Sequence, residues 1–345
     1  MKKVRVLLLN EKLELFKIGI KNKKIAVLGI GRSNIPAIQF LHKLGAKISV
    51  RDKNKSALEK CPELVKLDIE LLLGDNYLTN LDKFDYILRT PGIKPFLPEI
   101  EEAVKKGVKL TSEIELLIDL APCKVIGVTG SDGKTTTTTL IAKFLEKEGY
   151  KVWLGGNIGK SVFAEIEKMD RKDIIVLELS SFQLMTLRKS PNISVITNIS
   201  PNHLDYHRSF EEYVLAKANI FFKQTKNDLL VLNNDDKYTE KYLSIIQTNK
   251  IQTNIRKFSL NGEVEKGTYL ENDEIIYNDG KEKTKICDKK DVKLVGMHNI
   301  ANICTAISAC FDLVSVESIK DVITNFSGVE HRMEFVRCIS RSKLL

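Results

Sequence analysis

Short apolar runs alternate with amphipathic segments along most of this chain. In the first third, Lys24 to Leu28, Lys47 to Val50 and Phe84 to Leu88 are apolar runs of strand length. Ile35 to Leu44 and Ser112 to about Leu120 have instead the three- to four-residue spacing of helices. Strands that alternate with helices predict an α/β fold built on parallel sheets.

The same alternation continues through the second third of the chain. Strands are predicted at Lys124 to Val128, Asp173 to Leu179 and Ile193 to Ile199. Helices are predicted at Thr137 to Lys147 and Glu211 to Phe222.

A domain boundary is predicted near residue 120, where one helix ends and, after Pro122, a new strand begins. The 345 residues exceed what one ordinary core accommodates, so two or three domains are expected. We predict a first domain at 1–120, a central domain at 121–327 and a short final segment at 328–345.

The composition is that of a soluble globular protein, with 43% hydrophobic and 29% charged residues. No apolar run reaches membrane-spanning length, so we expect a cytoplasmic protein with no membrane partner. The net charge of +9 comes from lysines scattered along the chain, so no nucleic-acid partner is expected. Cys304 and Cys310 fall in an apolar helical stretch and no Cys-x-x-Cys pair occurs, which predicts reduced thiols in the core.

The segment Gly127 to Thr136, Gly-Val-Thr-Gly-Ser-Asp-Gly-Lys-Thr-Thr, predicts a phosphate-binding loop between a strand and a helix. Its glycines let backbone N–H groups approach phosphate oxygens, and the helix N-terminus adds partial positive charge. Lys134 can reach the terminal phosphates of a nucleotide, and the Thr135 hydroxyl can bind Mg2+. The usual spacing is not met, because Val128 stands at the first glycine position and Gly127 lies one residue earlier. The alternative is a glycine turn that merely caps a helix.

A second glycine cluster, Gly29-Ile-Gly31, follows the first predicted strand and precedes a helix. With Asp52 after the second strand it resembles a dinucleotide-binding fingerprint, but Asn34 replaces the third glycine. Thr90-Pro-Gly92 follows another strand, and open α/β sheets bind ligands at the carboxyl ends of their strands. These turns predict a ligand site in the first domain.

Two predicted strands of the central domain lead to residues that could bind a metal ion. Glu178 lies near the end of an apolar run, where a nucleotide-bound Mg2+ needs a carboxylate. His203 follows the next strand. A lone histidine is often structural, but four of the five histidines, His203, His207, His298 and His331, lie near motif-like loops, which favours a functional role.

Six segments of this chain resemble, in order and spacing, the motifs of the Mur ligases, the ATP-dependent amide-forming enzymes of peptidoglycan synthesis. They are Gly127 to Thr136, Glu178 to Leu184, Asn198 to Asp205, Tyr213 to Lys217, Gly296 to Asn302 and Gly328 to Glu334. The resemblance implies an N-terminal Rossmann-like domain that holds a UDP-sugar rather than NAD. It also implies a central P-loop ATPase-type α/β domain and a C-terminal Rossmann-like domain that is truncated here.

Within the family, Glu178-Leu-Ser-Ser-Phe-Gln-Leu184 resembles the D-glutamate-adding branch. This resemblance implies a ligase that uses ATP to phosphorylate the carboxylate of UDP-N-acetylmuramoyl-L-alanine and joins the acyl phosphate to D-glutamate. It further implies two Mg2+ sites, small-molecule partners and a monomeric chain.

The resemblance also implies roles for single residues. Lys134 stabilises the transferred phosphoryl group, Thr135 and Glu178 hold one Mg2+ ion, and His203 helps to hold a second. Lys217 matches a lysine that is carbamylated in the family and so becomes an anionic metal ligand. Spacing alone favours a surface lysine at this helical position.

Two larger sets of contacts follow from the resemblance. The ATP contacts implied are Gly130, Ser131, Asp132, Gly133, Lys134, Thr135, Thr136, Asn299 and Arg332. The UDP-sugar contacts implied are Arg32, Ser33, Asp52, Thr90, Pro91 and Gly92 around UDP, and Asn157, Ser180 and Ser181 along the substrate channel. His298, Asn299 and Asn302 are expected to brace the central domain beside the nucleotide.

Three functions stay open from the sequence. In the family a third domain supplies the D-glutamate site, whereas only Arg337 to Leu345 follow the first strand of that domain here, so we expect ligase chemistry with little or no amide product. The second function is that of a non-catalytic remnant that binds UDP-sugar and ATP without turnover. The third, a dehydrogenase or P-loop kinase, is disfavoured by Asn34 and by Glu-Leu-Ser-Ser-Phe-Gln.

Overall fold

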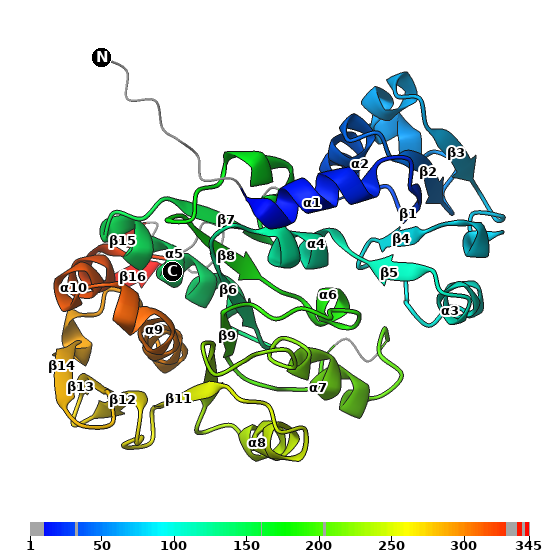
Figure 1. Ribbon diagram of the computed structural model, residues 1–345. Coiled ribbons are helices and arrows are strands. Elements are labelled where there is room, and N and C mark those ends of the chain that lie inside the picture. Colours follow the sequence, from blue (N-terminus) through cyan, green and yellow to red (C-terminus); the bar gives the residue numbers. More distant parts are fainter. Residues whose placement is uncertain are drawn as a thin grey trace.

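The computed structural model describes residues 10–31, 34–159, 161–202 and 205–328, and two short strands beyond them (Figure 1). These two strands, β15 (Arg337–Ile339) and β16 (Ser342–Leu344), form an antiparallel pair. The other described strands form two larger sheets, one N-terminal and one central. The predicted α/β class with parallel sheets is confirmed.

The N-terminal sheet has five parallel strands in the order β3-β2-β1-β4-β5. They are β1 (Lys24–Leu28), β2 (Lys47–Asp52), β3 (Glu70–Leu73), β4 (Tyr86–Arg89) and β5 (Lys109–Thr111). The helices of this part are α1 (Glu11–Ile20), α2 (Asn34–Lys43), α3 (Pro98–Lys105) and α4 (Glu113–Leu120), with 3-10 turns η1 (Ala57–Lys60), η2 (Pro62–Lys66) and η3 (Leu81–Lys83). Alternate residues of β1 face opposite sides, so Val27 packs with the α2 side chains and Ala26 with those of α3.

The central sheet has nine strands in the order β14-β13-β12-β11-β10-β9-β6-β8-β7. They are β6 (Lys124–Thr129), β7 (Val152–Gly156), β8 (Ile174–Glu178), β9 (Ile193–Ile196), β10 (Leu229–Asn233), β11 (Asn254–Ser259), β12 (Gly267–Glu271), β13 (Glu274–Asn278) and β14 (Lys283–Asp288). Every pairing from β7 to β12 is parallel, and β13 and β14 extend the sheet with antiparallel pairs.

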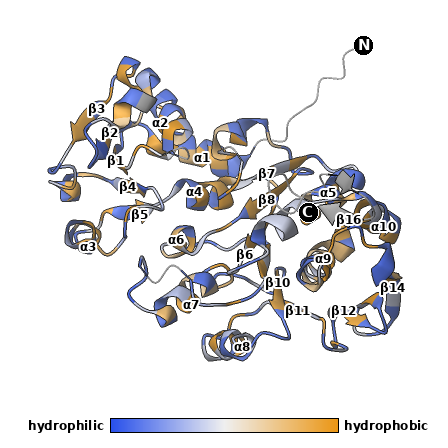
Figure 2. Cartoon of the chain, turned by 180° about the vertical axis from the view of Figure 1, so that it is seen from behind, coloured by the Kyte–Doolittle hydropathy of each residue, from blue (hydrophilic) through white to orange (hydrophobic). Residues whose placement is uncertain are grey.

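Helices cover both faces of the central sheet. They are α5 (Lys134–Lys147), α6 (Ser181–Leu184), α7 (Phe210–Ala218), α8 (Thr239–Thr248), α9 (Met297–Cys310) and α10 (Val316–Asn325), with 3-10 turns η4 (Phe163–Lys168), η5 (Lys289–Asp291) and η6 (Phe311–Leu313). Ile126 and Val128 of β6 pack in a cluster with α5, α9 and α10, whereas Val125 packs on the other face with α7, α8 and η4. Figure 2 shows the strands β6, β8 and β10 as hydrophobic segments, in keeping with a buried parallel sheet.

The two sheets share one apolar cluster. Leu13 of α1 and Leu117 of α4 belong to the same buried cluster as Phe163 and Val125 of the central part. The cluster therefore joins the helices α1 and α4 of the N-terminal part to the central part. None of the helices in the described part of the chain is long and apolar enough to cross a membrane.

Candidate active site

The loop between β6 and α5 accepts only glycine at two positions. Gly130 has φ +149° and Gly133 has φ +75°, values that other residues rarely adopt. A Cβ at Gly130 would lie 1.8 Å from Thr197 Oγ1, and one at Gly133 would lie 2.2 Å from Asn302 Oδ1. Gly133 is the N-cap of α5 and no side chain caps this end, so the first N–H groups of the helix can receive an anion.

Residues after β9 hold this loop through hydrogen bonds. The backbone N–H of Ser131 donates to Asn198 O at 2.9 Å, and that of Asp132 donates to Asn198 Oδ1 at 3.0 Å. Thr197 Oγ1 donates to Asp132 O at 2.6 Å. Asn198 therefore positions the phosphate loop through both its backbone and its side chain.

Lys134 begins α5 and folds back over the loop. Its Nζ donates to Ser131 O at 2.7 Å and to Gly130 O at 3.1 Å. The ammonium thus lies above the backbone that would surround bound phosphates, which is where a phosphate-loop lysine is needed.

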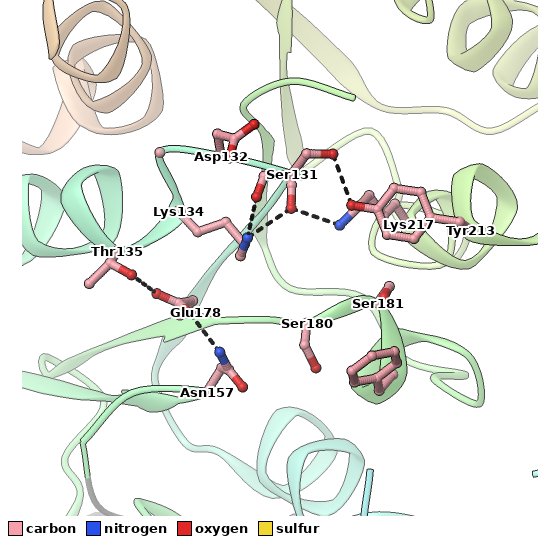
Figure 3. Close-up of a pocket in the computed structure, with 13 residues that line it drawn as sticks. Ser131, Asp132, Lys134, Thr135, Asn157, Glu178, Ser180, Ser181, Tyr213 and Lys217 are labelled. Atoms are coloured by element: carbon pink, nitrogen blue, oxygen red, sulfur yellow. Dashed lines mark hydrogen bonds between the residues drawn. The ribbon is translucent and has the colours of Figure 1, made fainter. Parts of the chain in front are cut away.

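Thr135, Glu178 and Asn157 form a chain of hydrogen bonds along one wall of the site (Figure 3). Thr135 Oγ1 donates to Glu178 Oε2 at 2.7 Å, and Asn157 Nδ2 donates to Glu178 Oε1 at 2.8 Å. Gly156 brings β7 close to the end of β8, since a Cβ there would lie 2.1 Å from Glu178 O. Glu178 is only 2% exposed, so its carboxylate is held in one orientation by these donors.

The donor set of this wall fits a magnesium ion. A hydroxyl and a carboxylate are hard oxygen ligands, and Mg2+ is usually held by one or two such protein groups together with phosphate oxygens and water. Thr135 and Glu178 supply these two groups side by side. Among the residues that the structure describes, no three His, Cys, Asp or Glu side chains gather as a self-sufficient metal site.

Lys217 lies inside the protein, so the expectation of a surface lysine drawn from spacing alone is wrong. Only 1% of the residue is exposed, and its Nζ donates to Gly130 O at 2.8 Å and to Thr129 Oγ1 at 3.4 Å. The ammonium also lies 4.6 Å from the centre of the Tyr213 ring. Burial, with the nearby Lys134 charge, lowers the pKa of Lys217 well below its ordinary value.

The turn after β8 brings two serines to the site. Ser180 is the N-cap of α6 and forms a capping box with Gln183, which fixes the backbone at this point. Ser181 Oγ lies 2.9 Å from His207 Nε2. The His207 ring in turn stacks on Phe182, with ring centres 5.7 Å apart.

These elements enclose a cavity of about 300 Å³ at the carboxyl edge of the central sheet. Figure 3 shows its labelled side chains converging from the loop, β8, the β7 end and α7. The lining residues are Gly130, Ser131, Asp132, Gly133, Lys134, Thr135, Asn157, Glu178, Ser180, Ser181, Phe182, Tyr213 and Lys217. The cations, the backbone donors and the Glu178 carboxylate around this space can hold a polyphosphate with a divalent ion.

A second group of predicted residues gathers at the carboxyl edge of the N-terminal sheet. Asp52 accepts hydrogen bonds from the backbone N–H groups of Ile30 and Asn54, both at 2.8 Å. Thr90 packs so closely on the glycine turn that a Cβ at Gly29 would lie 2.3 Å from its Cγ2. Asn34, which replaces the third glycine, donates to Gly29 O at 2.9 Å and holds this turn.

The remaining predicted residues divide into two groups. Thr136 lies in the first turn of α5 but does not line the cavity. Asn299 does not line it either, and accepts a hydrogen bond from Asn302 Nδ2 at 3.2 Å. Asn302 Oδ1 accepts from Thr137 of α5, so this pair links α9 to the first turns of α5. Arg32, Ser33, His203 and Arg332 lie outside the described residues.

The structure adds three residues that sequence reasoning did not single out. Tyr213 OH lies 2.8 Å from Ser131 Oγ and lines the cavity, and Arg89 and Tyr206 join the N-terminal turn to the central part. Tyr213 is the first residue of the Tyr-x-x-x-Lys segment, and this motif could have identified it from the sequence. Arg89 belongs to no motif, because it is the last residue of an ordinary apolar strand.

Both large parts of the chain match known family models. Residues 23–112 match the model of the Mur ligase MurD-like N-terminal domain, and residues 128–310 match that of the Mur ligase middle domain. A UDP-N-acetylmuramoylalanine–D-glutamate ligase of Clostridium botulinum strain 657 is 51% identical over 330 residues, which are 95% of this chain and 70% of the relative. The same-named ligase of Clostridium kluyveri is 48% identical over the same share of each chain.

Solved structures share the fold at lower identity. The UDP-N-acetylmuramate:L-alanyl-gamma-D-glutamyl-meso-diaminopimelate ligase from Neisseria meningitides has a TM-score of 0.58 and 19% identity, covering 89% of this chain and 99% of that one. The UDP-N-acetylmuramate-alanine ligase from Thermotoga maritima has a TM-score of 0.51 and 21% identity, covering 92% of this chain and 72% of that one.

Proposed function

This chain belongs to the Mur ligase family, and from that premise we propose that it carries out the ATP-dependent carboxylate activation of the ligase that adds D-glutamate to UDP-N-acetylmuramoyl-L-alanine. The observation that carries the proposal is the cavity in which Lys134, Thr135 and Glu178 meet the Ser180-Ser181 turn. It would provide phosphate-binding and metal-binding groups beside a turn whose next residue, Phe182, accepts a hydrogen bond from Arg89 of the N-terminal part. The 51% identity to ligases of this name supports the choice of amino acid.

The reaction requires activation of a carboxylate, because oxide is not a viable leaving group. In the proposed first step, an oxygen of the muramoyl-alanine carboxylate attacks the γ-phosphorus of ATP, and ADP leaves. The D-glutamate amine then attacks the acyl carbon, phosphate leaves, and the amine loses a proton as the amide forms. Both steps bring anions together, so catalysis depends on positioning and charge neutralisation.

The groups of the phosphate loop suit the first step. The open N–H groups at the start of α5 would bind β- and γ-phosphate oxygens, and Lys134 would exchange its loop carbonyls for the phosphoryl group in transfer. Thr135 and Glu178 would hold Mg2+, which when bound neutralises charge on the phosphate oxygens.

A second Mg2+ site is proposed around Lys217 and His203. The lowered pKa of Lys217 favours the neutral amine, and this is the form that adds CO2, releasing a proton to give an anionic carbamate. His203, which is not among the described residues, is the second proposed ligand of this ion.

We assign the UDP-sugar to the N-terminal turns and the cavity together. Asp52, Thr90, Pro91 and Gly92 would hold the UDP end, with Arg32 and Ser33 beside them. Asn157, Ser180 and Ser181 would line the path of the muramoyl-alanine toward the phosphates. The proposed setting is a monomer in the cytoplasm with small-molecule partners.

The test is calorimetric titration of the purified chain with UDP-N-acetylmuramoyl-L-alanine, with Mg-ATP and with NAD. The proposal expects one site for each of the first two ligands and none for NAD. Binding of NAD at the N-terminal glycine turn, with no affinity for the UDP-sugar, would contradict it.

A further inference from the structure

Arg89, the last residue of β4, is buried between the two domains. Only 1% of the residue is exposed, and burial lowers the pKa of its guanidinium. Within the described residues no carboxylate pairs with it, and its polar partners are carbonyl and hydroxyl oxygens. Burying a guanidinium without a carboxylate partner costs free energy, and the hydrogen bonds to these oxygens offset part of that cost.

One side of the guanidinium organises the N-terminal turn. Nη1 donates to Thr90 O at 3.3 Å, to Pro91 O at 3.2 Å and to Ile93 O. Three carbonyls of a four-residue turn thus face a single side-chain nitrogen. Tyr206 OH joins them, donating to Pro91 O at 2.7 Å and to Ile93 O at 3.1 Å.

The other nitrogen of the fork reaches the central domain. Nη2 donates to Phe182 O at 2.9 Å and to Thr186 Oγ1 at 3.2 Å. Phe182 lines the cavity directly after the Ser180-Ser181 turn, and its ring lies 4.1 Å from that of Tyr206. A single planar group therefore ties both turns together.

We propose that Arg89 is a positioning residue that sets the spacing between the UDP half and the acyl half of the UDP-sugar site. This inference rests on the proposed function, because it needs one ligand to span both turns. The planar fork fixes two directions at once, which the single ammonium of a lysine cannot do. A ligand that spans both turns gains its full affinity only when this spacing is already set.

Three variants test the inference by calorimetry, with Arg51→Gln as a matched control. Arg51 is also a buried arginine of the N-terminal sheet, but its bonds to Ser49 and Thr79 stay within that domain. The test variants are Arg89→Gln, Arg89→Lys and the milder Tyr206→Phe. Three ligands are titrated. UDP-N-acetylmuramoyl-L-alanine would contact both turns, UDP would contact only the N-terminal turn, and Mg-ATP would contact neither turn.

For Arg89→Gln we expect the spanning ligand to lose roughly tenfold to a hundredfold in affinity, UDP less, and Mg-ATP nothing. Arg89→Lys keeps the charge but should recover little, and Tyr206→Phe should shift the same ratio by about threefold through its lost hydrogen bonds. Arg51→Gln should leave all three affinities unchanged.

Equal losses for all three ligands, or unchanged affinity in Arg89→Gln, would overturn the inference while leaving the proposed function intact. If the Arg89 variants do not fold, an unchanged ligand ratio in Tyr206→Phe overturns it instead. A wild-type chain that does not bind the UDP-sugar overturns the proposed function and this inference with it.

Discussion

Thr135 Oγ1 donates a hydrogen bond to Glu178 Oε2 over 2.7 Å, which joins the first turn of α5 to the end of β8. Asn157 holds the other carboxylate oxygen at 2.8 Å. One oxygen of Glu178 is therefore directed at the helix N-terminus where phosphates are proposed to bind. A magnesium ion would take the place of this hydrogen bond, with the hydroxyl and the carboxylate as its protein ligands.

The first prediction follows from that pair. Thr135→Val removes one ligand oxygen, so the Mg2+ concentration needed for tight ATP binding should rise roughly tenfold to a hundredfold. Thr139→Val is the matched control, because its hydroxyl donates to the Thr135 carbonyl within the same helix and does not line the cavity. Calorimetry of ATP binding across a magnesium series measures both variants. An identical magnesium requirement in the two would remove Thr135 from the metal site.

Lys134 supplies a second prediction. Its side chain lines the cavity and is not part of the apolar clusters, so Lys134→Ala should leave the fold intact. ATP should bind more weakly and ATP-dependent chemistry should fall by about a hundredfold to a thousandfold. Lys143→Ala, on the same helix and paired with Glu146 at its surface, is the control. Wild-type ATP affinity in Lys134→Ala, at an unchanged melting temperature, would exclude the loop from the nucleotide site.

A third prediction concerns Asp52 and tests whether the UDP-sugar and ATP bind at separate sites. Its carboxylate holds the Ile30 and Asn54 N–H groups at the end of β2, so Asp52→Ala should weaken UDP-sugar binding by about tenfold or more. Mg-ATP affinity should stay unchanged, because its proposed contacts lie on the other sheet. Asp68→Ala, an exposed aspartate before β3 at the opposite sheet edge, should change neither affinity. Parallel losses for both ligands in Asp52→Ala would contradict separate sites.

Glu113 predicts a pH dependence of stability. Its carboxylate accepts from Ser161 Oγ at 2.9 Å and from Phe163 N, and burial raises its pKa from 4.5 to about 7. The stability it contributes is full below pH 4.5, where both folded and unfolded states are protonated, and is lost as pH rises through 7. Glu113 alone should therefore lower the unfolding free energy of the wild type by about 3 kcal/mol over this window.

Glu113→Gln should remove this contribution, so its stability should fall less steeply with pH than that of the wild type, whereas exposed Glu240→Gln should fall as steeply as the wild type. Chemical denaturation at a series of pH values from 4.5 to 8 measures the difference. A Glu113→Gln chain whose stability falls with pH as steeply as the wild type would show that another group titrates.

The local spacing of apolar residues was enough to predict several helices and strands of the fold. β1 spans Lys24–Leu28 as predicted, and Ser112 caps a helix that ends at Leu120. The helix predicted to end at Phe222 ends at Ala218 instead. Ile220 and Phe221 are buried in the turn that follows and continue the apolar spacing, so the sequence pattern did not reveal where the helix ends. The antiparallel strands β13 and β14 were not predicted, since only pairing across the sheet defines them.

Site residues that lie together in one sequence motif could be predicted, whereas contacts between segments far apart in the sequence could not. The phosphate loop and Glu178 lie in continuous motifs, and the structure brings them to one cavity. Arg89 and Phe182 are 93 residues apart, so no spacing rule joins them. Lys217 was expected at the surface from helical spacing alone, whereas tertiary packing against Gly130 and Tyr213 buries it.

Phosphate release by the purified 345-residue chain tests the central claim most directly. The measurement compares release from Mg-ATP with and without UDP-N-acetylmuramoyl-L-alanine, with Lys134→Ala as the background. Because the phosphate loop is proposed to transfer the γ-phosphoryl group to the muramoyl-alanine carboxylate, release should require the UDP-sugar and disappear in Lys134→Ala. Release at the same rate without the UDP-sugar, or undiminished release by Lys134→Ala, would contradict the account.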